Sequence, residues 1–215
     1  MIERLEELAR EEYIARHSSD EPDVLREITR EANFSLTHPR MVSGHIQGLF
    51  LTMMTRLIRP ERVLEIGTFV GYATICLAKG LPESGRLTTI EVNDELRQRI
   101  ERNLEKAGVS DKVELRIGDA LEVLDSLEIE SFGLVYLDAN KAQYPEYYEI
   151  LSGRLPKGAL ILADNTLWGG KLWRGEYHDP QTEGIRRFNQ MVADDARVDK
   201  VLMPVRDGLT MIRIK

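Results

Sequence analysis

Hydrophobic residues along most of this chain fall into short runs that alternate with amphipathic segments. Five runs have the length and composition of buried strands, at residues 62–67, 86–92, 112–118, 132–139 and 158–165. Between them, apolar residues recur at helical spacing, at 71–81, 94–108, 119–127 and 144–155. Strands that alternate with helices predict a parallel sheet joined by right-handed crossovers.

The two ends of the chain depart from this alternation. A helix predicted at 184–195 is followed by two apolar runs, 199–205 and 208–215, whose short link requires an antiparallel hairpin. The first 35 residues read as two polar helices, and an apolar helix follows them until Pro60. We therefore expect residues 1–40 to be a helical extension, outside the core, of one domain that spans residues 1–215.

Five parallel strands closed by an antiparallel pair are typical of one α/β fold. This pattern predicts the Rossmann-like class I methyltransferase fold, with a seven-stranded, mostly parallel sheet and helices on both faces. Rossmann dehydrogenases normally have six parallel strands instead. A chain of 215 residues is long enough to bury the core of one such domain.

Composition and charge argue against several classes of function. The formal charge of -7 would repel nucleic acid, and no apolar run approaches the ~20 residues of a membrane helix. The amino-terminal segment MIERLEELAREEY lacks the apolar stretch of a secretory signal. We expect a cytoplasmic protein without nucleic-acid or membrane partners, in which the lone Cys76 is a small core residue.

Acids and glycines after the first three strands predict a cofactor site. Gly67 and Gly71 follow the first strand, where missing β-carbons let a ligand approach the backbone; the G-x-x-x-G spacing does not match dinucleotide or triphosphate motifs. Glu91 ends the second strand, at the position of a ribose-binding acid. With Glu65 and Asp119 it forms an acidic rim that suits a cationic sulfonium ligand. The alternative is that these residues only make turns, a helix cap and a solvated strand end.

Polar residues after the fourth and fifth strands predict a metal site. Asp138, Asp164 and Asn165 form an all-oxygen set, which prefers Mg²⁺, Ca²⁺ or Mn²⁺ over zinc. An open position on such an ion would lower the pKa of a phenolic hydroxyl and fix its oxygen for attack on a methyl group. Lys141 lies three residues beyond Asp138 and is the candidate general base. Asp138 and Lys141 are the predicted catalytic residues. Each residue alone could instead form a turn or an exposed helix start.

These motifs together resemble the cation-dependent O-methyltransferases, the family of catechol and caffeoyl-coenzyme A O-methyltransferases. The chain is more similar to the caffeoyl-coenzyme A type and its bacterial relatives. The similarity runs from MVSGHIQGLFL at residue 41 through LEIGTFVGY, IEV, GDALEVL, YLDANKAQY and DNTLWGG to PVRDGLTMIRIK. The segments LDAxK and DNTLWGG are its specific part, because many methyltransferases share the glycine turn.

The resemblance implies S-adenosylmethionine (SAM) as cofactor, a divalent cation such as Mg²⁺, a small aromatic hydroxyl substrate and a homodimer. It implies metal at Asp138, Asp164 and Asn165, with Lys141 beside the reacting oxygen. The residues expected to contact the cofactor are Met41, Ser43, Glu65, Gly67, Gly71, Glu91, Asp119, Ala120, Asp138 and Asn140. Trp168 and Trp173 flank glycines and could wall an aromatic substrate, although such residues are also common in packed lids.

The chain departs from the family pattern at two places. Ala73 stands where a serine is common after Gly-Tyr, and no counterpart is found of the glutamate with which the animal catechol enzyme holds the second hydroxyl. The expected acceptor is therefore an ortho-dihydroxy aromatic in general: a catechol, a hydroxycinnamoyl ester or a flavonoid. Two alternatives stay open, a nicotinamide-dependent oxidoreductase and a non-catalytic binding module. The glycine spacing disfavours the first, and the presence of Asp138, Lys141 and Asp164 disfavours the second.

Overall fold

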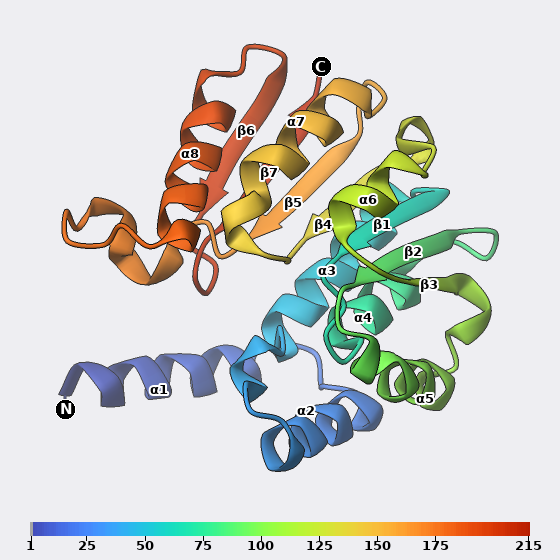
Figure 1. Cartoon of the computed structure of the whole chain (residues 1–215). Coiled ribbons are helices and arrows are strands. Elements are labelled where there is room, and N and C mark those ends of the chain that lie inside the picture. Colours follow the sequence, from blue (N-terminus) through green and yellow to red (C-terminus); the bar gives the residue numbers. More distant parts are fainter. Residues whose placement is uncertain (1) are drawn as a thin grey trace.

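A seven-stranded sheet organises the computed structural model, which describes residues 2–215 (Figure 1). The strands are β1 Arg62–Ile66, β2 Arg86–Glu91, β3 Val113–Ile117, β4 Leu134–Leu137, β5 Leu160–Asp164, β6 Val198–Met203 and β7 Leu209–Ile214. Their order is β3-β2-β1-β4-β5-β7-β6. β1 to β5 pair in parallel, whereas β7 lies antiparallel between β5 and β6. The predicted fold class and the carboxy-terminal hairpin are confirmed.

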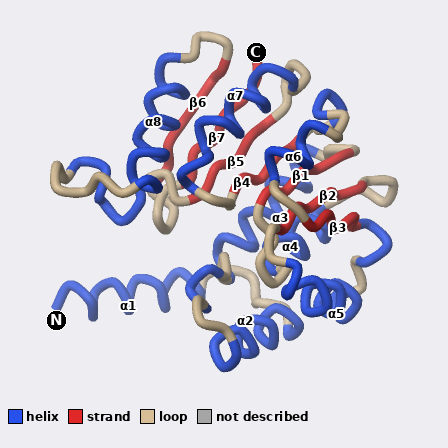
Figure 2. Tube along the Cα trace, in the orientation of Figure 1, coloured by secondary structure: helices blue, strands red, loops and turns tan. Residues whose placement is uncertain are grey.

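Helices cover both faces of this sheet (Figure 2). They are α1 Ile2–Arg16, α2 Asp23–Ser35, α3 His45–Ile58, α4 Tyr72–Gly80, α5 Arg97–Ala107, α6 Ala120–Asp125, α7 Tyr144–Arg154 and α8 Pro180–Asp194. One core cluster joins α3, α4 and α5 to the sheet, and a second joins α6, α7 and α8. Along β1, Val63 faces the first cluster and Leu64 the second, because successive strand side chains point to opposite faces.

The second amino-terminal helix corrects one prediction. Leu25, Ile28 and Ala32 are buried in the same core cluster as the sheet residues, so α2 is not outside the core. Their spacing of three and four residues gives α2 an apolar face despite its polar composition. By contrast, α1 extends away from the sheet in Figure 1, and its Leu8 and Tyr13 are exposed.

The last helix begins earlier than the sequence predicts. α8 starts at Pro180 rather than near residue 184, because the Asp179 carboxylate accepts a hydrogen bond from the Thr182 amide and Pro180 suits a first helical position.

Within residues 2–215, no helix is both long and apolar enough to cross a membrane.

The order of the strands reverses between β1 and β4, which places a crevice at their carboxyl ends. The Asp138 amide donates to the Ile66 carbonyl at 2.9 Å, and the Gly67 amide donates to the Ile90 carbonyl at 3.0 Å. These hydrogen bonds extend the sheet by one residue beyond the strands. The loops after β1, β2 and β4 therefore start side by side.

Candidate active site

A cavity of about 920 Å³ opens at this edge of the sheet. The predicted site residues in its wall are Met41, Ser43, Gly67, Glu91, Asp119, Ala120, Asp138, Asn140, Lys141, Asp164, Asn165 and Trp168. The wall does not include Glu65, Gly71 or Trp173. The structure therefore brings most of the predicted cofactor half and the whole predicted metal half into one space.

The glycine turn after β1 sits against the end of β4. Gly67 has φ of 98°, and a Cβ at this position would overlap the Asp138 carbonyl oxygen. Only glycine allows this approach, which joins the two halves of the cavity. Gly71, at φ of 81°, precedes α4, and a Cβ there would meet its nearest neighbour at an ordinary 3.7 Å. Its role in the structure is that of a turn residue.

Gly67→Ala is expected to lower the free energy of unfolding by more than about 1 kcal/mol, because both the backbone conformation and the Asp138 carbonyl oppose a side chain. It should also weaken ligand binding in the cavity. Gly153→Ala is the matched control: Gly153 lies within α7 with open space around it, so alanine should stabilise by up to about 1 kcal/mol. Urea unfolding of both variants measures the difference, and equal effects would contradict it.

Glu91 is held by the backbone of the glycine turn. Its Oε2 accepts hydrogen bonds from the amides of Phe69 at 2.7 Å and Thr68 at 3.3 Å, and Oε1 accepts one from Asn93 at 2.9 Å. Only 8% of the residue is exposed, so the alternative of a solvated strand end is wrong. Oε1 keeps a lone pair that can accept a hydrogen bond from a ligand hydroxyl in the cavity.

Asp119 and Asn140 each cap the start of a helix in the cavity wall. The Asp119 carboxylate accepts from the Leu121 amide at 2.9 Å, as the helix-cap interpretation requires. The Asn140 side-chain oxygen accepts from the Ala142 amide at 3.3 Å. Both residues also face the cavity, so capping and ligand contact are compatible roles.

Glu65 lies behind the cavity wall instead of in it. It is fully buried, with hydroxyl donors from Thr74 and Thr89 on Oε2, and Oε1 has no hydrogen-bond partner among the described residues. Its pKa is raised to about 8, mainly by burial and also by the charges of Asp138 and Glu91, while the two hydrogen bonds oppose the rise. In this structure its contacts are therefore with the sheet and α4.

The raised pKa of Glu65 predicts a pH dependence of stability. Below pH 4.5, Glu65 is protonated in both the folded and the unfolded protein. Between pH 4.5 and about 8, Glu65 keeps its proton only in the folded protein, so the free energy of unfolding falls as the pH rises. Above pH 8 the effect is complete. Glu65→Gln should reduce this fall by up to about 1.4 kcal/mol per pH unit. Thermal unfolding from pH 5 to 9 tests it, and parallel curves for the two proteins would contradict it.

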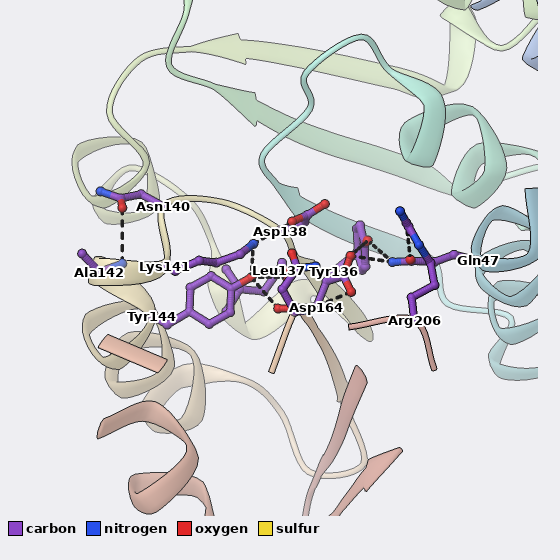
Figure 3. Close-up of polar contacts among 11 residues, drawn as sticks. Gln47, Tyr136, Leu137, Asp138, Asn140, Lys141, Ala142, Tyr144, Asp164 and Arg206 are labelled. Atoms are coloured by element: carbon purple, nitrogen blue, oxygen red, sulfur yellow. Dashed lines mark hydrogen bonds and ion pairs between the residues drawn. The ribbon is translucent and has the colours of Figure 1, made fainter. Parts of the chain in front are cut away.

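Lys141 is buried between an acid and a phenol, as Figure 3 shows. Its Nζ donates to Asp138 Oδ1 at 2.7 Å and to Tyr144 Oη at 2.8 Å. The Tyr144 hydroxyl in turn donates to the Leu137 carbonyl at 2.9 Å, which fixes its lone pairs toward the amine. The alternative of an exposed helix start is wrong for Lys141, because only 6% of the residue is exposed.

Asp164 ends β5 and is 2% exposed. Its Oδ2 accepts from Gln47 Nε2 at 2.6 Å and Tyr136 Oη at 3.1 Å, and its Oδ1 accepts from the Asn165 amide at 2.8 Å. Burial raises the pKa of this carboxyl, and the negative charge of Asp138 raises it further. The carboxyl groups of Asp138 and Asp164 therefore line the same cavity and are close enough for their charges to interact.

The chemistry of these donors fits a hard divalent cation. Two carboxylates that repel each other and one amide oxygen next to them, on Asn165, form the kind of all-oxygen set that such ions prefer. Among residues 2–215, no group of three or more His, Cys, Asp and Glu side chains is placed to hold a metal. The metal therefore stays a prediction that rests on two carboxylates and an amide.

The two tryptophans have different surroundings. Trp168 lines the cavity, and its Nε1 donates to Thr182 Oγ1 at 3.0 Å. Trp173 is 68% exposed outside the wall and packs against Gly170. Substrate contact remains a prediction for both, and the geometry favours Trp168.

Four residues of the polar network were not predicted from the sequence: Gln47, Tyr136, Tyr144 and Arg206. Gln47 gave a usable signal, because it is a polar residue in an otherwise apolar helical run. Tyr144 follows Lys141 by three residues, at a spacing that brings side chains together on a helix. Arg206 lies in a turn and gave none.

The chain is similar in sequence to a family of known enzymes. A family model described as O-methyltransferase matches residues 15–215. Curated relatives include the catechol O-methyltransferase of Niastella koreensis, 33% identical over 79% of this chain and 80% of its own length. The caffeoyl-CoA O-methyltransferase 1 of Zea mays is 36% identical over 88% and 76%.

Solved structures show the same similarity. The O-methyltransferase from Bacillus cereus in complex with SAH superposes with a TM-score of 0.88 at 30% identity, covering 96% of this chain and 97% of that one. An O-methyltransferase from Streptomyces achromogenes involved in tomaymycin synthesis, in complex with SAM, has a TM-score of 0.84 at 32% identity, with 94% of both chains covered.

Proposed function

The chain belongs to the O-methyltransferase family, and from this premise we propose that it transfers the methyl group of SAM to a hydroxyl of a small catechol-like or hydroxycinnamoyl aromatic, with a divalent cation at the reacting centre. One observation carries the proposal: a single cavity at the reversal of strand order contains both the glycine turn with its acids and a buried lysine beside two carboxylates. The first suits a sulfonium cofactor and the second a hydroxyl nucleophile.

In the cofactor half, the turn at Gly67 would let the ligand approach the backbone, and the Glu91 carboxylate would accept a hydrogen bond from a ribose hydroxyl. Asp119 and Ala120 would contact the adenine, and Met41, Ser43 and Asn140 line the same cavity. The SAH and SAM complexes of the two similar structures support this choice of cofactor. Glu65 lies behind the cavity wall and accepts hydrogen bonds from the hydroxyls of Thr74 and Thr89.

In the acceptor half, Asp138, Asp164 and Asn165 would hold the divalent cation. Such an ion, when bound, lowers the pKa of a phenolic hydroxyl and fixes its oxygen. With the cation bound, the ammonium form of Lys141 would be disfavoured, and its neutral Nζ would accept the proton of the attacking hydroxyl as the oxygen takes the methyl group from sulfur. Asp138 and Tyr144 then accept hydrogen bonds from the resulting ammonium, whose positive charge they stabilise.

The acceptor class follows from the relatives and from the wall. The names of the relatives give catechol and caffeoyl-CoA as their acceptors, and Trp168 offers an aromatic surface near the metal half. A cytoplasmic location and a homodimer stay predictions. Exposed Met53 and Leu57 on α3 support the dimer, because they give this helix an apolar outer surface.

Ligand binding tests the cofactor first. SAH at 100 times its Kd should add about 2.7 kcal/mol to stability, which raises Tm by roughly 5 to 10 °C for a chain of this size, whereas NAD should add nothing. Stabilisation by NAD alone would instead support the nicotinamide-dependent oxidoreductase. A panel of phenols incubated with SAM and Mg²⁺, analysed by mass spectrometry, should then identify acceptors that gain one methyl group.

A further inference from the structure

The side chain of Gln47 lies between Asp164 and Arg206 (Figure 3). It is 1% exposed, in the first turn of α3. Its Nε2 donates to Asp164 Oδ2 at 2.6 Å and to Tyr136 Oη at 2.7 Å, and its Oε1 accepts from Arg206 Nη1 at 2.7 Å. A guanidinium has only donors and a carboxylate only acceptors, so a single orientation of the amide satisfies both neighbours.

Arg206 adopts a backbone conformation that residues with a side chain rarely adopt. It lies in the turn between β6 and β7 at φ of 49°, in the left-handed region. Its guanidinium also donates to the carbonyls of Ser43 and Val42, the latter at 3.4 Å, so it joins this turn to the segment that leads into α3. Residues in such conformations persist where their surroundings fix them, and they are frequent at functional sites.

We propose that Arg206 is a positioning residue: through the Gln47 amide it fixes the Asp164 carboxylate in the orientation in which it faces Asp138 and Asn165. The proposal rests on the proposed function, in which Asp164 is a ligand of the cation. Without Arg206, Gln47 Oε1 loses its donor, and only the hydrogen bonds from Nε2 to Asp164 and Tyr136 restrain the amide. Each rotation that turns the amide oxygen toward the carboxylate then places two acceptors against each other and removes one donor from Asp164.

A double-mutant cycle on metal affinity tests the relay. Arg206→Ala, Gln47→Leu and the double variant are titrated with Mn²⁺ and followed by electron paramagnetic resonance. Each single change should weaken Mn²⁺ binding by about 10- to 100-fold, as loss of an outer partner of a metal ligand does. The double variant should bind no more weakly than Gln47→Leu, because Arg206 acts through Gln47. Unchanged affinity in Arg206→Ala, or effects that multiply, would overturn the proposal.

Arg59 supplies a matched control. It is also an exposed arginine with a left-handed backbone, at φ of 51°, and it follows the opposite end of α3, outside the cavity wall. Arg59→Ala should keep the Mn²⁺ affinity of the parent protein. An equal loss in both variants would overturn the proposal, because it would trace the effect to the backbone of α3 and not to the guanidinium.

A second readout needs neither metal nor activity. In ¹⁵N-labelled protein the Gln47 side-chain amide protons should exchange slowly with solvent, and measurably faster in Arg206→Ala. Unchanged exchange would overturn the proposal even where Mn²⁺ does not bind. Equal Mn²⁺ affinity in the parent protein and Asp164→Asn would contradict the metal assignment of the proposed function, and the exchange measurement would still judge the link between Arg206 and Gln47.

Discussion

Lys141→Ala is expected to lower kcat by about 10²- to 10⁴-fold, the usual contribution of a positioned general base. The physical reason is specific to this cavity: Lys141 is the buried amine whose Nζ is fixed by Asp138 Oδ1 and Tyr144 Oη. The cofactor half does not depend on this amine, so the Kd for SAH should change little. Steady-state kinetics and calorimetric titration with SAH measure the two quantities separately.

The controls for Lys141 separate chemistry from folding. Lys141→Met keeps much of the buried side-chain volume and should lose as much activity as the alanine variant, because neither residue accepts a proton. Lys157→Ala, at an exposed lysine between α7 and β5, should behave as the parent protein. An equal loss of kcat and of SAH affinity in Lys141→Ala would show that the lysine supports the cavity as a whole and is not the base.

Asp164→Asn should abolish most metal-dependent activity. Asparagine has nearly the same volume and can keep contacts with Gln47 and Tyr136, so the fold should survive. The substitution removes one of the two carboxylate charges at the predicted metal site. Mn²⁺ affinity should therefore fall by at least about 100-fold, because loss of a residue that only hydrogen-bonds to a metal ligand already costs up to about that much. Asp164→Ala should have the same effect on activity and lose stability as well.

Matched measurements decide the role of Asp164. Asp125→Asn, at an exposed aspartate at the end of α6, should leave Mn²⁺ affinity and kcat unchanged. The residual rate of Asp164→Asn should no longer respond to added Mg²⁺. A variant that still requires Mg²⁺ with the affinity of the parent protein would remove Asp164 from the ligand set.

The sequence predicted the residues whose position depends on topology alone. Parallel strands bring their carboxyl ends to one edge, so Gly67, Asp138 and Asp164 had to meet once their strands were recognised. Glu65 shows the limit of that argument. It lies in β1 on the side of α4, so its carboxylate contacts Thr74 and Thr89 in the layer behind the cavity.

Other features depend on tertiary contacts that no local pattern encodes. Arg206 reaches Gln47 across 159 residues of sequence, through a turn whose direction follows from the packing of β6 and β7. Trp168 and Trp173 lie five residues apart in one glycine-containing segment, yet only the first faces the cavity, because Gly169 and Gly170 turn the chain at positive φ. The burial of α2 likewise depended on a partner surface that the sequence did not identify.

The central claim is metal-dependent methyl transfer from SAM to an aromatic hydroxyl, and one measurement tests it most directly. Transfer of the labelled methyl group of SAM to caffeate or catechol is followed with Mg²⁺, with EDTA, and with EDTA followed by excess Mg²⁺. We predict transfer in the first condition, loss to background in the second and recovery in the third. Undiminished transfer in EDTA would contradict the role given to Asp138, Asp164 and Asn165.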